Sequence, residues 1–291
     1  MFEKILLATD LSPAWDEIIA CAGELRVLGA RELILAHVIT VKFLGGMEAK
    51  LLSEAEPRLA AQKEKLTAQG FQVHTEVVTG LPGYVLYDVA RHYGAQLLVV
   101  GPQKTSRWQE RLLGSVTGAV LHHAELPILL LKARITAEMP EGTCRLQATE
   151  LLRHLLFPTD FSDTARGALE VLMELGPRGV AKVSLLHALD VPGGFEYPPG
   201  FQELAVAQAQ GQLEEWAARL QQAGIPLVSQ VFDPGRPLPA ILRVLEREDI
   251  SLILMGTQGK GFLKELFLGS VAHNVARLAP CPVLLIPPAR R

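Results

Sequence analysis

The sequence repeats itself over nearly its whole length, and this repeat limits the chain to two copies of one fold. Residues 6–12 (LLATDLS) return as residues 156–162 (LFPTDFS) at an offset of 150. Further along, residues 101–131 align without gaps to residues 256–286, and 12 of the 31 aligned positions are identical. Unrelated sequences of ordinary composition would share about two. The chain therefore contains a duplicated domain.

Each copy alternates short apolar runs with longer helical patterns, which is typical of βαβ units around a buried parallel sheet. We predict an α/β protein of two tandem domains, residues 1–134 and 152–291, joined by a linker at 135–151. Each domain is expected to hold a five-stranded, mostly parallel sheet with helices on both faces. The predicted strands are 3–9, 32–39, 72–78, 96–100 and 127–132 in the first copy, and 153–159, 181–188, 226–232, 251–255 and 282–286 in the second.

Composition narrows the possible partners and compartments. A net charge of −3 and a pI near 6.3 provide no general attraction for a polyphosphate backbone, so no nucleic-acid partner is expected. Cys21, Cys144 and Cys281 are too few and too widely separated for a disulfide framework or a zinc site. We see no signal peptide, and the apolar runs are shorter than the roughly 20 residues that span a bilayer. These features predict a cytoplasmic protein without a membrane partner.

A glycine-containing segment follows the fourth predicted strand of the second copy. It reads Gly256-Thr-Gln-Gly259, then nine residues, then Gly269-Ser270 at the start of a helical pattern. Glycines let backbone amides approach a ligand, and we expect Ser270 to cap a helix whose free N–H groups favour an anion such as phosphate. The segment is neither a Walker loop nor the dinucleotide fingerprint, so P-loop hydrolysis and NAD binding are not expected.

The spacing of this segment resembles the nucleotide-binding signature of the universal stress protein family. Both copies share that family's early aspartate after the first strand and a second strand ending in His plus a small apolar residue. The resemblance implies a Rossmann-like domain, similar to the adenine nucleotide alpha hydrolase fold. It also implies binding of ATP or another adenine nucleotide, with or without Mg²⁺. Carried over to the second copy, the implied nucleotide-binding residues are Pro158, Thr159, Asp160, Ala188, Gly256, Gln258, Gly259, Gly269, Ser270 and Val271.

The first copy departs from the signature at one position. Lys104 stands where the second glycine belongs. A side chain there either blocks the close backbone approach or pairs its ammonium group with a phosphate. We therefore expect weaker binding at the first-copy site, which would consist of Ala8, Thr9, Asp10, Val38, Gly101, Lys104, Gly114, Ser115 and Val116.

Structural explanations compete with these functional ones. Asp10 and Asp160 could be helix-entry residues with no further role, and the single glycines could be simple turn or cap residues. His37 and His187 end apolar strands with no nucleophile beside them, which favours satisfied core histidines over catalytic bases. We predict no catalytic residue and no metal site.

The predicted function is that of an ATP-binding tandem universal stress protein, acting as a regulatory binding module in a stress response. Two alternatives stay open, namely a slow ATPase or nucleotidyl-transfer enzyme, and an interaction protein without a ligand. The resemblance also implies pairing through the edge strands at 127–131 and 282–286, because such edges otherwise expose unpaired backbone groups. This pairing can be internal in a tandem chain, and we expect a homodimer. The downstream protein partner is unknown.

Overall fold

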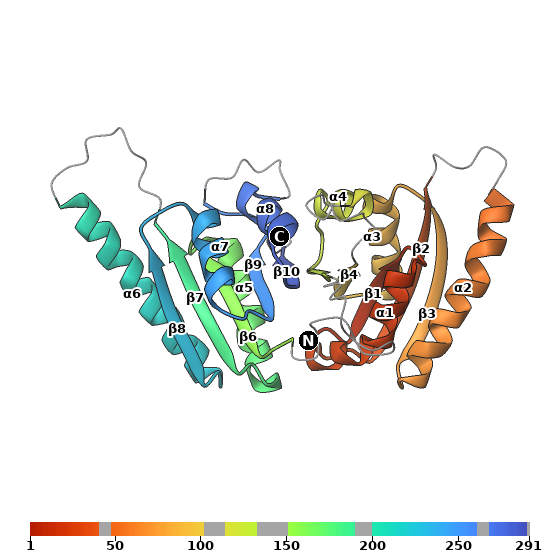
Figure 1. Ribbon diagram of the computed structural model, residues 1–291, viewed down its shortest axis with the longest axis horizontal. Coiled ribbons are helices and arrows are strands. Elements are labelled where there is room, and N and C mark those ends of the chain that lie inside the picture. Colours follow the sequence, from red (N-terminus) through yellow and green to blue (C-terminus); the bar gives the residue numbers. More distant parts are fainter. Residues whose placement is uncertain (41–47, 102–113, 133–150, 190–199, 261–267, 290–291) are drawn as a thin grey trace. The chain divides into compact units, whose positions relative to one another are not determined.

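The computed structural model describes residues 1–40, 48–101, 114–132, 151–189, 200–260 and 268–289. Contacts divide the chain into two compact units, unit 1 from Met1 to Glu150 and unit 2 from Leu151 to Arg291 (Figure 1). The predicted linker 135–151 lies outside the described residues except for Leu151, and Lys104 lies outside them as well.

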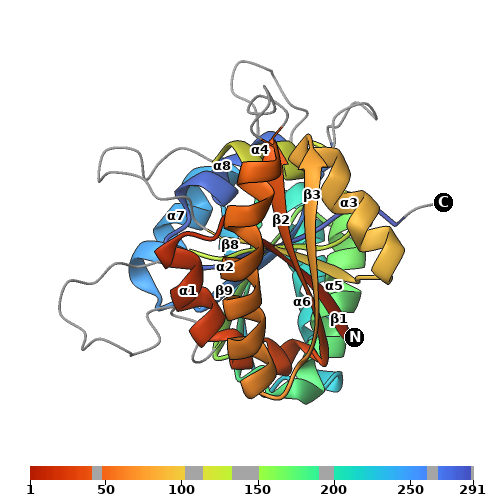
Figure 2. The ribbon, with the colours of Figure 1, turned by 90° about the vertical axis from the view of Figure 1, so that its right-hand side faces the viewer.

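Unit 1 contains a parallel sheet in the order β3-β2-β1-β4-β5. Helices α1 and α2 contact each other, as do α3 and α4; Figure 2 shows α1 and α2 side by side. Right-handed crossovers place these two pairs on opposite faces of the sheet. The elements are β1 (Lys4–Thr9), α1 (Pro13–Ala20), a 3₁₀ helix (Ala22–Leu28), β2 (Glu32–Thr40), α2 (Glu48–Ala68), β3 (Gln72–Gly80), α3 (Pro82–Tyr93), β4 (Leu97–Val100), α4 (Ser115–Leu121) and β5 (Ile128–Leu130).

Unit 2 repeats this topology with the parallel order β10-β9-β6-β7-β8. Its helix pairs α5 with α6 and α7 with α8 make the corresponding contacts. The elements are β6 (His154–Thr159), α5 (Asp163–Leu175), a 3₁₀ helix (Gly176–Arg178), β7 (Lys182–Ala188), α6 (Phe201–Gln222), β8 (Leu227–Asp233), α7 (Pro237–Arg247), β9 (Leu252–Gly256), α8 (Ser270–Leu278) and β10 (Val283–Ile286).

The central strands are buried on both faces, because helices cover each side of the sheet. In β4, β5, β9 and β10 every residue is buried, and every residue of these strands except Gly256 is apolar. These uninterrupted apolar runs made the strands visible in the sequence. The fold class predicted from the sequence is therefore confirmed for both units.

The buried tryptophan comes from different helices in the two units. In unit 1 it is Trp15 on α1, and in unit 2 it is Trp216 on α6, each 2% exposed. The Trp216 ring stacks on Phe157 with centroids 6.0 Å apart and meets Phe161 edge-on at 5.0 Å. Each unit thus contains an intrinsic fluorescent probe of its own core.

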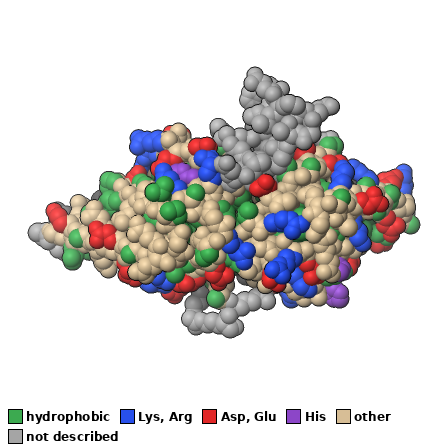
Figure 3. Space-filling model, turned by 90° about the horizontal axis from the view of Figure 1, so that it is seen from below, with side chains coloured by type: hydrophobic (Ala, Val, Ile, Leu, Met, Phe, Trp, Pro, Cys, Tyr) green, Lys and Arg blue, Asp and Glu red, His purple; other side chains and the backbone are tan. Residues whose placement is uncertain are grey.

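Three further features bear on the predictions made from composition. Cys21 is disulfide-bonded, so the small number of widely separated cysteines does not exclude a single disulfide. Among the described residues, no helix combines the length and apolar character needed to cross a membrane. Acidic and basic side chains are interspersed on the face that Figure 3 presents, as the small net charge suggests.

Candidate functional site

The first strand of unit 1 ends in a turn held by its own side chains. Thr9 Oγ1 accepts a hydrogen bond from the Leu11 N–H at 3.0 Å, and Asp10 Oδ1 accepts one from the Ser12 N–H at 2.8 Å. Leu11 has φ of 58°, in the left-handed region that only glycine enters freely. Arg58 on α2 donates to the Leu11 carbonyl. The turn is therefore fixed from both sides.

Unit 2 builds the same turn with the equivalent residues. Thr159 Oγ1 accepts from the Phe161 N–H at 3.0 Å, and Asp160 Oδ1 accepts from the Ser162 N–H at 3.0 Å. Phe161 has φ of 59°. Non-glycine residues in this conformation are uncommon and concentrate at functional sites. Their occurrence at the same point of both units marks these two turns as candidate sites.

A histidine from the neighbouring strand contacts each turn. His37 Nδ1 lies 2.9 Å from the Thr9 carbonyl, and His187 Nδ1 lies 2.8 Å from the Thr159 carbonyl. A carbonyl oxygen only accepts, so Nδ1 carries the proton in both rings. Burial lowers the pKa of His187, which keeps this imidazole neutral at pH 7. The contacts support the structural interpretation of these histidines.

A cavity of about 60 Å³ opens beside the turn of unit 1, at the carboxyl ends of β1, β2 and β4. Ligands bind at this edge in open α/β sheets. Its walls combine aliphatic side chains with a few polar groups, the composition of a small-molecule site. The lining residues are Ala8, Thr9, Asp10, Trp15, Ala36, His37, Val38, Val100, Gly101, Val116 and Thr117.

The structure brings together six of the nine residues predicted for this first site. Ala8, Thr9, Asp10, Val38, Gly101 and Val116 line the cavity. Gly114 is the N-cap residue of α4 and Ser115 its first helical residue, and neither lines the cavity. Sequence reasoning did not assign the other lining residues to this site, because apolar and helical residues give no sign of a ligand and the histidine was interpreted as a core residue. They are Trp15, Ala36, His37, Val100 and Thr117.

A buried glutamine supports the turn of unit 1 from α2. Gln62 is 2% exposed, and its Oε1 accepts a hydrogen bond from Thr9 Oγ1 at 3.0 Å. Its Nε2 donates to Asp16 Oδ1 on α1 at 3.0 Å. One side chain thus connects α2, β1 and α1 next to the cavity. The hydrogen-bonding capacity of this buried amide is used on both of its ends, as burial requires.

In unit 2 the aspartate also holds the glycine segment. Asp160 Oδ2 accepts a hydrogen bond from the Lys260 N–H at 2.7 Å, while its Oδ1 serves the turn. A Cβ on Gly259 would lie 2.6 Å from Asp160 Oδ2. Gly259 therefore leaves room for the Asp160 carboxylate, whereas the sequence analysis explained this glycine only by the approach of a ligand. Lys260 Nζ lies 5.8 Å from the centre of the Phe161 ring.

The first glycine of each signature has a packing role. A Cβ on Gly256 would lie 2.9 Å from Thr164 Cγ2 and 3.2 Å from the Thr164 backbone carbon. A Cβ on Gly101 would lie 2.7 Å from Ile18 Cδ1. These glycines let the helix that follows the first strand cross close over the end of the fourth strand.

The expected capping role of Ser270 is wrong in detail. Gly269 is the N-cap residue of α8, and Ser270 is its first helical residue, exposed and without a side-chain cap. The Gly269 N–H donates to the Thr257 carbonyl at 2.7 Å, which fixes the start of the helix beside the end of β9. The free amides of α8 still begin at Ser270 and Val271.

The other predicted residues of unit 2 lie at the same edge of its sheet. Pro158 and Thr159 end β6, and Ala188 ends β7. Gln258 follows β9 and is half-buried. Within the described part of the chain, no group of three or more His, Cys, Asp or Glu side chains could hold a metal ion.

Known proteins have sequences similar to both copies of the repeat. The family model described as "Universal stress protein family" matches residues 1–132 and again residues 152–287. A universal stress protein of Mycobacterium tuberculosis is 29% identical over 97% of this chain and 95% of its own length. One from Thermus aquaticus is 32% identical over 47% of this chain and 99% of its own length.

A solved structure agrees with the fold. The crystal structure of a universal stress protein from Archaeoglobus fulgidus has a TM-score of 0.76 and 22% identity, covering 99% of this chain and all of its own. At that identity the similarity concerns the fold alone. The family model, however, covers both halves of the sequence. The chain therefore belongs to the universal stress protein family and carries two copies of that family's domain.

Proposed function

We propose that this chain is a regulatory module that binds ATP or a related adenine nucleotide at the carboxyl edge of each sheet. The observation that carries the proposal is the cavity of unit 1, whose walls include Asp10, Thr9 and Val38. These are residues that the repeat and the family signature single out. The same turn, aspartate and histidine recur in unit 2.

The chemistry of the cavity suits an adenosine. Ala8, Ala36 and Val38 provide apolar surface for a planar base, and the Asp10 carboxylate accepts hydrogen bonds from ribose hydroxyls. In unit 2 the phosphates would meet the free amides of α8 at Ser270 and Val271, where the helix dipole favours negative charge. The bound nucleotide would supply a signal of energy state.

The proposal is tested with the full chain. Mass spectrometry of nucleotide released from freshly purified protein should find an adenine nucleotide, and calorimetry should measure binding of ATP, ADP and AMP, with and without Mg²⁺. Asp160→Asn should weaken binding on the order of tenfold, as expected for a lost charge-assisted hydrogen bond. Asp163→Asn, at a fully exposed carboxylate three residues away, is the matched control.

Two results would contradict the proposal. One is a chain that binds no adenine nucleotide, and the other is an Asp160→Asn variant that binds like the control. Fast ATP cleavage that Asp160→Asn abolishes would favour the enzyme alternative instead. Homodimer formation through β5 and β10 and a cytoplasmic location stay predictions, the first of them open to measurement of the mass in solution.

A further inference from the structure

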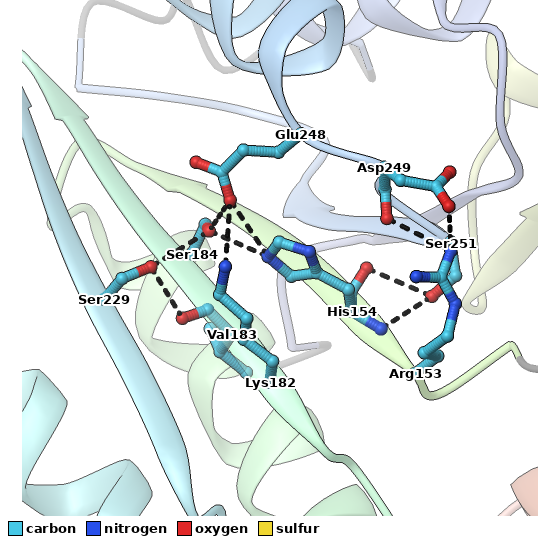
Figure 4. A network of polar contacts seen from close by, with 9 residues as sticks. All are labelled: Arg153, His154, Lys182, Val183, Ser184, Ser229, Glu248, Asp249 and Ser251. Carbon is cyan, nitrogen blue, oxygen red and sulfur yellow. Dashed lines mark hydrogen bonds and ion pairs between the residues drawn. The ribbon is translucent and has the colours of Figure 1, made fainter.

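A cluster of polar side chains occupies the amino edge of the sheet in unit 2, at the opposite ends of the strands from Asp160. His154 is the first residue of β6, Lys182 and Ser184 belong to β7, and Glu248 directly follows α7 (Figure 4). We name His154, Lys182, Ser184 and Glu248 the amino-edge cluster. It lies away from the candidate ligand residues, and the proposed function does not use it.

One carboxylate oxygen serves the whole cluster. Glu248 Oε2 lies 2.8 Å from Ser184 Oγ, 3.2 Å from His154 Nε2 and 3.3 Å from Lys182 Nζ. His154 Nε2 is also 2.9 Å from Ser184 Oγ. Ser184 is fully buried and His154 is 6% exposed, whereas the Lys182 side chain is 37% exposed. A neutral His154 can donate its Nε2 proton here while Lys182 supplies the only positive charge within the cluster.

Protonation of His154 would place two cations on the same carboxylate oxygen. Burial is the main cause that lowers the pKa of His154, and Lys182 and Arg153 lower it further. Glu248 and Asp249 act in the opposite direction but do not compensate. Arg153 and Asp249 are themselves paired at 2.7 Å. His154 is therefore neutral in the folded unit near pH 7, and its burial makes the charged form costly.

Unit 1 carries a different pair at the same place. Lys4 begins β1 and Glu32 begins β2, with Lys4 Nζ 3.2 Å from Glu32 Oε1. A lysine keeps its charge through the neutral and mildly acidic range. His74 Nε2 also lies 3.3 Å from Glu32 Oε1, but the His74 side chain is 36% exposed, whereas His154 is buried. The duplication thus places a lysine–glutamate ion pair in unit 1 where unit 2 has a buried histidine.

We propose that the amino-edge cluster is a pH-sensitive switch that loosens unit 2 selectively when the surroundings acidify. A proton on His154 places a second positive charge beside Lys182 at the Glu248 carboxylate, and the two cations repel each other. Glu248 lies in the connection between α7 and β9. Because β9 leads into the glycine segment at Gly256, loosening at this edge reaches the element that supports the candidate site of unit 2. Unit 1 has no buried histidine at this place, so acidification over the same range should lower its stability by less.

The direction of the effect follows from proton linkage. Unfolded chains bind a proton at histidine near the ordinary pKa of about 6.5, whereas folded His154 binds it only at lower pH. The stability that neutral His154 contributes is therefore complete above about pH 6.5 and is lost as the pH falls below that value. Each proton taken up only on unfolding raises the unfolding equilibrium constant up to about tenfold per pH unit.

The two tryptophans allow each unit to be followed within the full chain. Trp15→Phe with Trp108→Phe leaves Trp216 as the probe of unit 2, and Trp216→Phe with Trp108→Phe leaves Trp15 for unit 1. Urea unfolding is measured by fluorescence at about pH 7.5 and about pH 5.5. The midpoint of unit 2 should fall on acidification by more than that of unit 1. An equal or smaller fall in unit 2 would overturn the proposal.

Two variants assign the effect to the cluster. His154→Gln should reduce the fall in the unit 2 midpoint, and His187, whose pKa is also lowered by burial, accounts for the remainder. Lys182→Gln removes a half-exposed cation that opposes protonation, so it too should make the fall shallower. A fall that Lys182→Gln leaves unchanged, or one that a folded His154→Gln retains in full, would contradict the switch.

Discussion

Leu11 and Phe161 adopt a backbone conformation that costs an L-amino acid on the order of 1 kcal/mol, and each directly follows a candidate ligand aspartate. The strain is held by side chains that precede it, since Thr9 and Thr159 accept from the strained residues' own N–H groups. A turn fixed in this way presents its carboxylate in one orientation before any ligand arrives. Such preorganisation lowers the entropic cost of binding.

Replacement of Gly259 should separate binding from stability. In Gly259→Ala the new Cβ would lie 2.6 Å from Asp160 Oδ2, and this carboxylate must move from the Lys260 N–H. Because the displaced group is the end of a flexible side chain, the cost in unfolding free energy should stay below about 1 kcal/mol. Affinity for an adenine nucleotide should fall on the order of tenfold by calorimetry, since the displaced carboxylate would no longer accept a charge-assisted hydrogen bond from the ribose.

Gly167→Ala provides the matched control for this substitution. Gly167 lies on the exposed face of α5, where an added Cβ meets nothing within 4 Å. This variant should bind as the parent does and gain slightly in stability from the better helix propensity of alanine. If both glycine variants bind alike, Gly259 does not act through Asp160 at the ligand site.

The helices that follow the two first strands differ in their caps, although their sequences begin alike. Ser162 Oγ accepts from the Ala165 N–H at 3.2 Å and caps α5. Ser12 occupies the same position before α1, but its buried Oγ has no partner among the described residues. Ser162→Ala should therefore cost unit 2 about 1 kcal/mol, whereas Ser12→Ala should leave unit 1 nearly unchanged.

Urea unfolding followed by Trp216 for unit 2 and Trp15 for unit 1 measures this difference directly. The two units serve as controls for each other, because the two substitutions remove equivalent hydroxyl groups from equivalent turns. Equal losses in the two units would show that the cap geometry of α5 does not carry the stabilisation.

Helices and strands were predictable from the sequence where the local pattern of apolar and turn residues determines them. The ten strands in the described part of the chain begin and end within two residues of their predicted bounds, because buried parallel strands need apolar runs bounded by turns. The cap of α8 was misplaced by one residue, since Gly269 and Ser270 both suit a helix start. The amino-edge cluster was not predicted, because His154 and Glu248 are 94 positions apart in the sequence and meet only in the folded sheet.

At the scale of the whole molecule, the duplication gives one chain two related candidate sites, one in each unit. The complete glycine signature belongs to unit 2, whereas the cavity described above lies in unit 1, where Lys104 replaces the second glycine. Backbone amides can approach a phosphate closely only where glycine leaves room for it. The glycine signature should therefore contribute more to affinity than the apolar cavity does. We therefore expect unequal binding, with unit 2 the tighter site.

Ligand-induced stabilisation of the two units can test this order. A ligand that binds only the folded state adds stability in proportion to the logarithm of its concentration over its Kd, about 2.7 kcal/mol at a hundredfold excess. With ATP present, the thermal midpoint reported by Trp216 should therefore rise further than that reported by Trp15. Asp160→Asn should reduce the rise in the midpoint of unit 2 and leave that of unit 1 unchanged, because Asp160 belongs to the candidate site of unit 2 alone. A larger rise in unit 1 would mean that Lys104 strengthens phosphate binding through its charge, and that the cavity lined by Trp15 and Val38 identifies the stronger site.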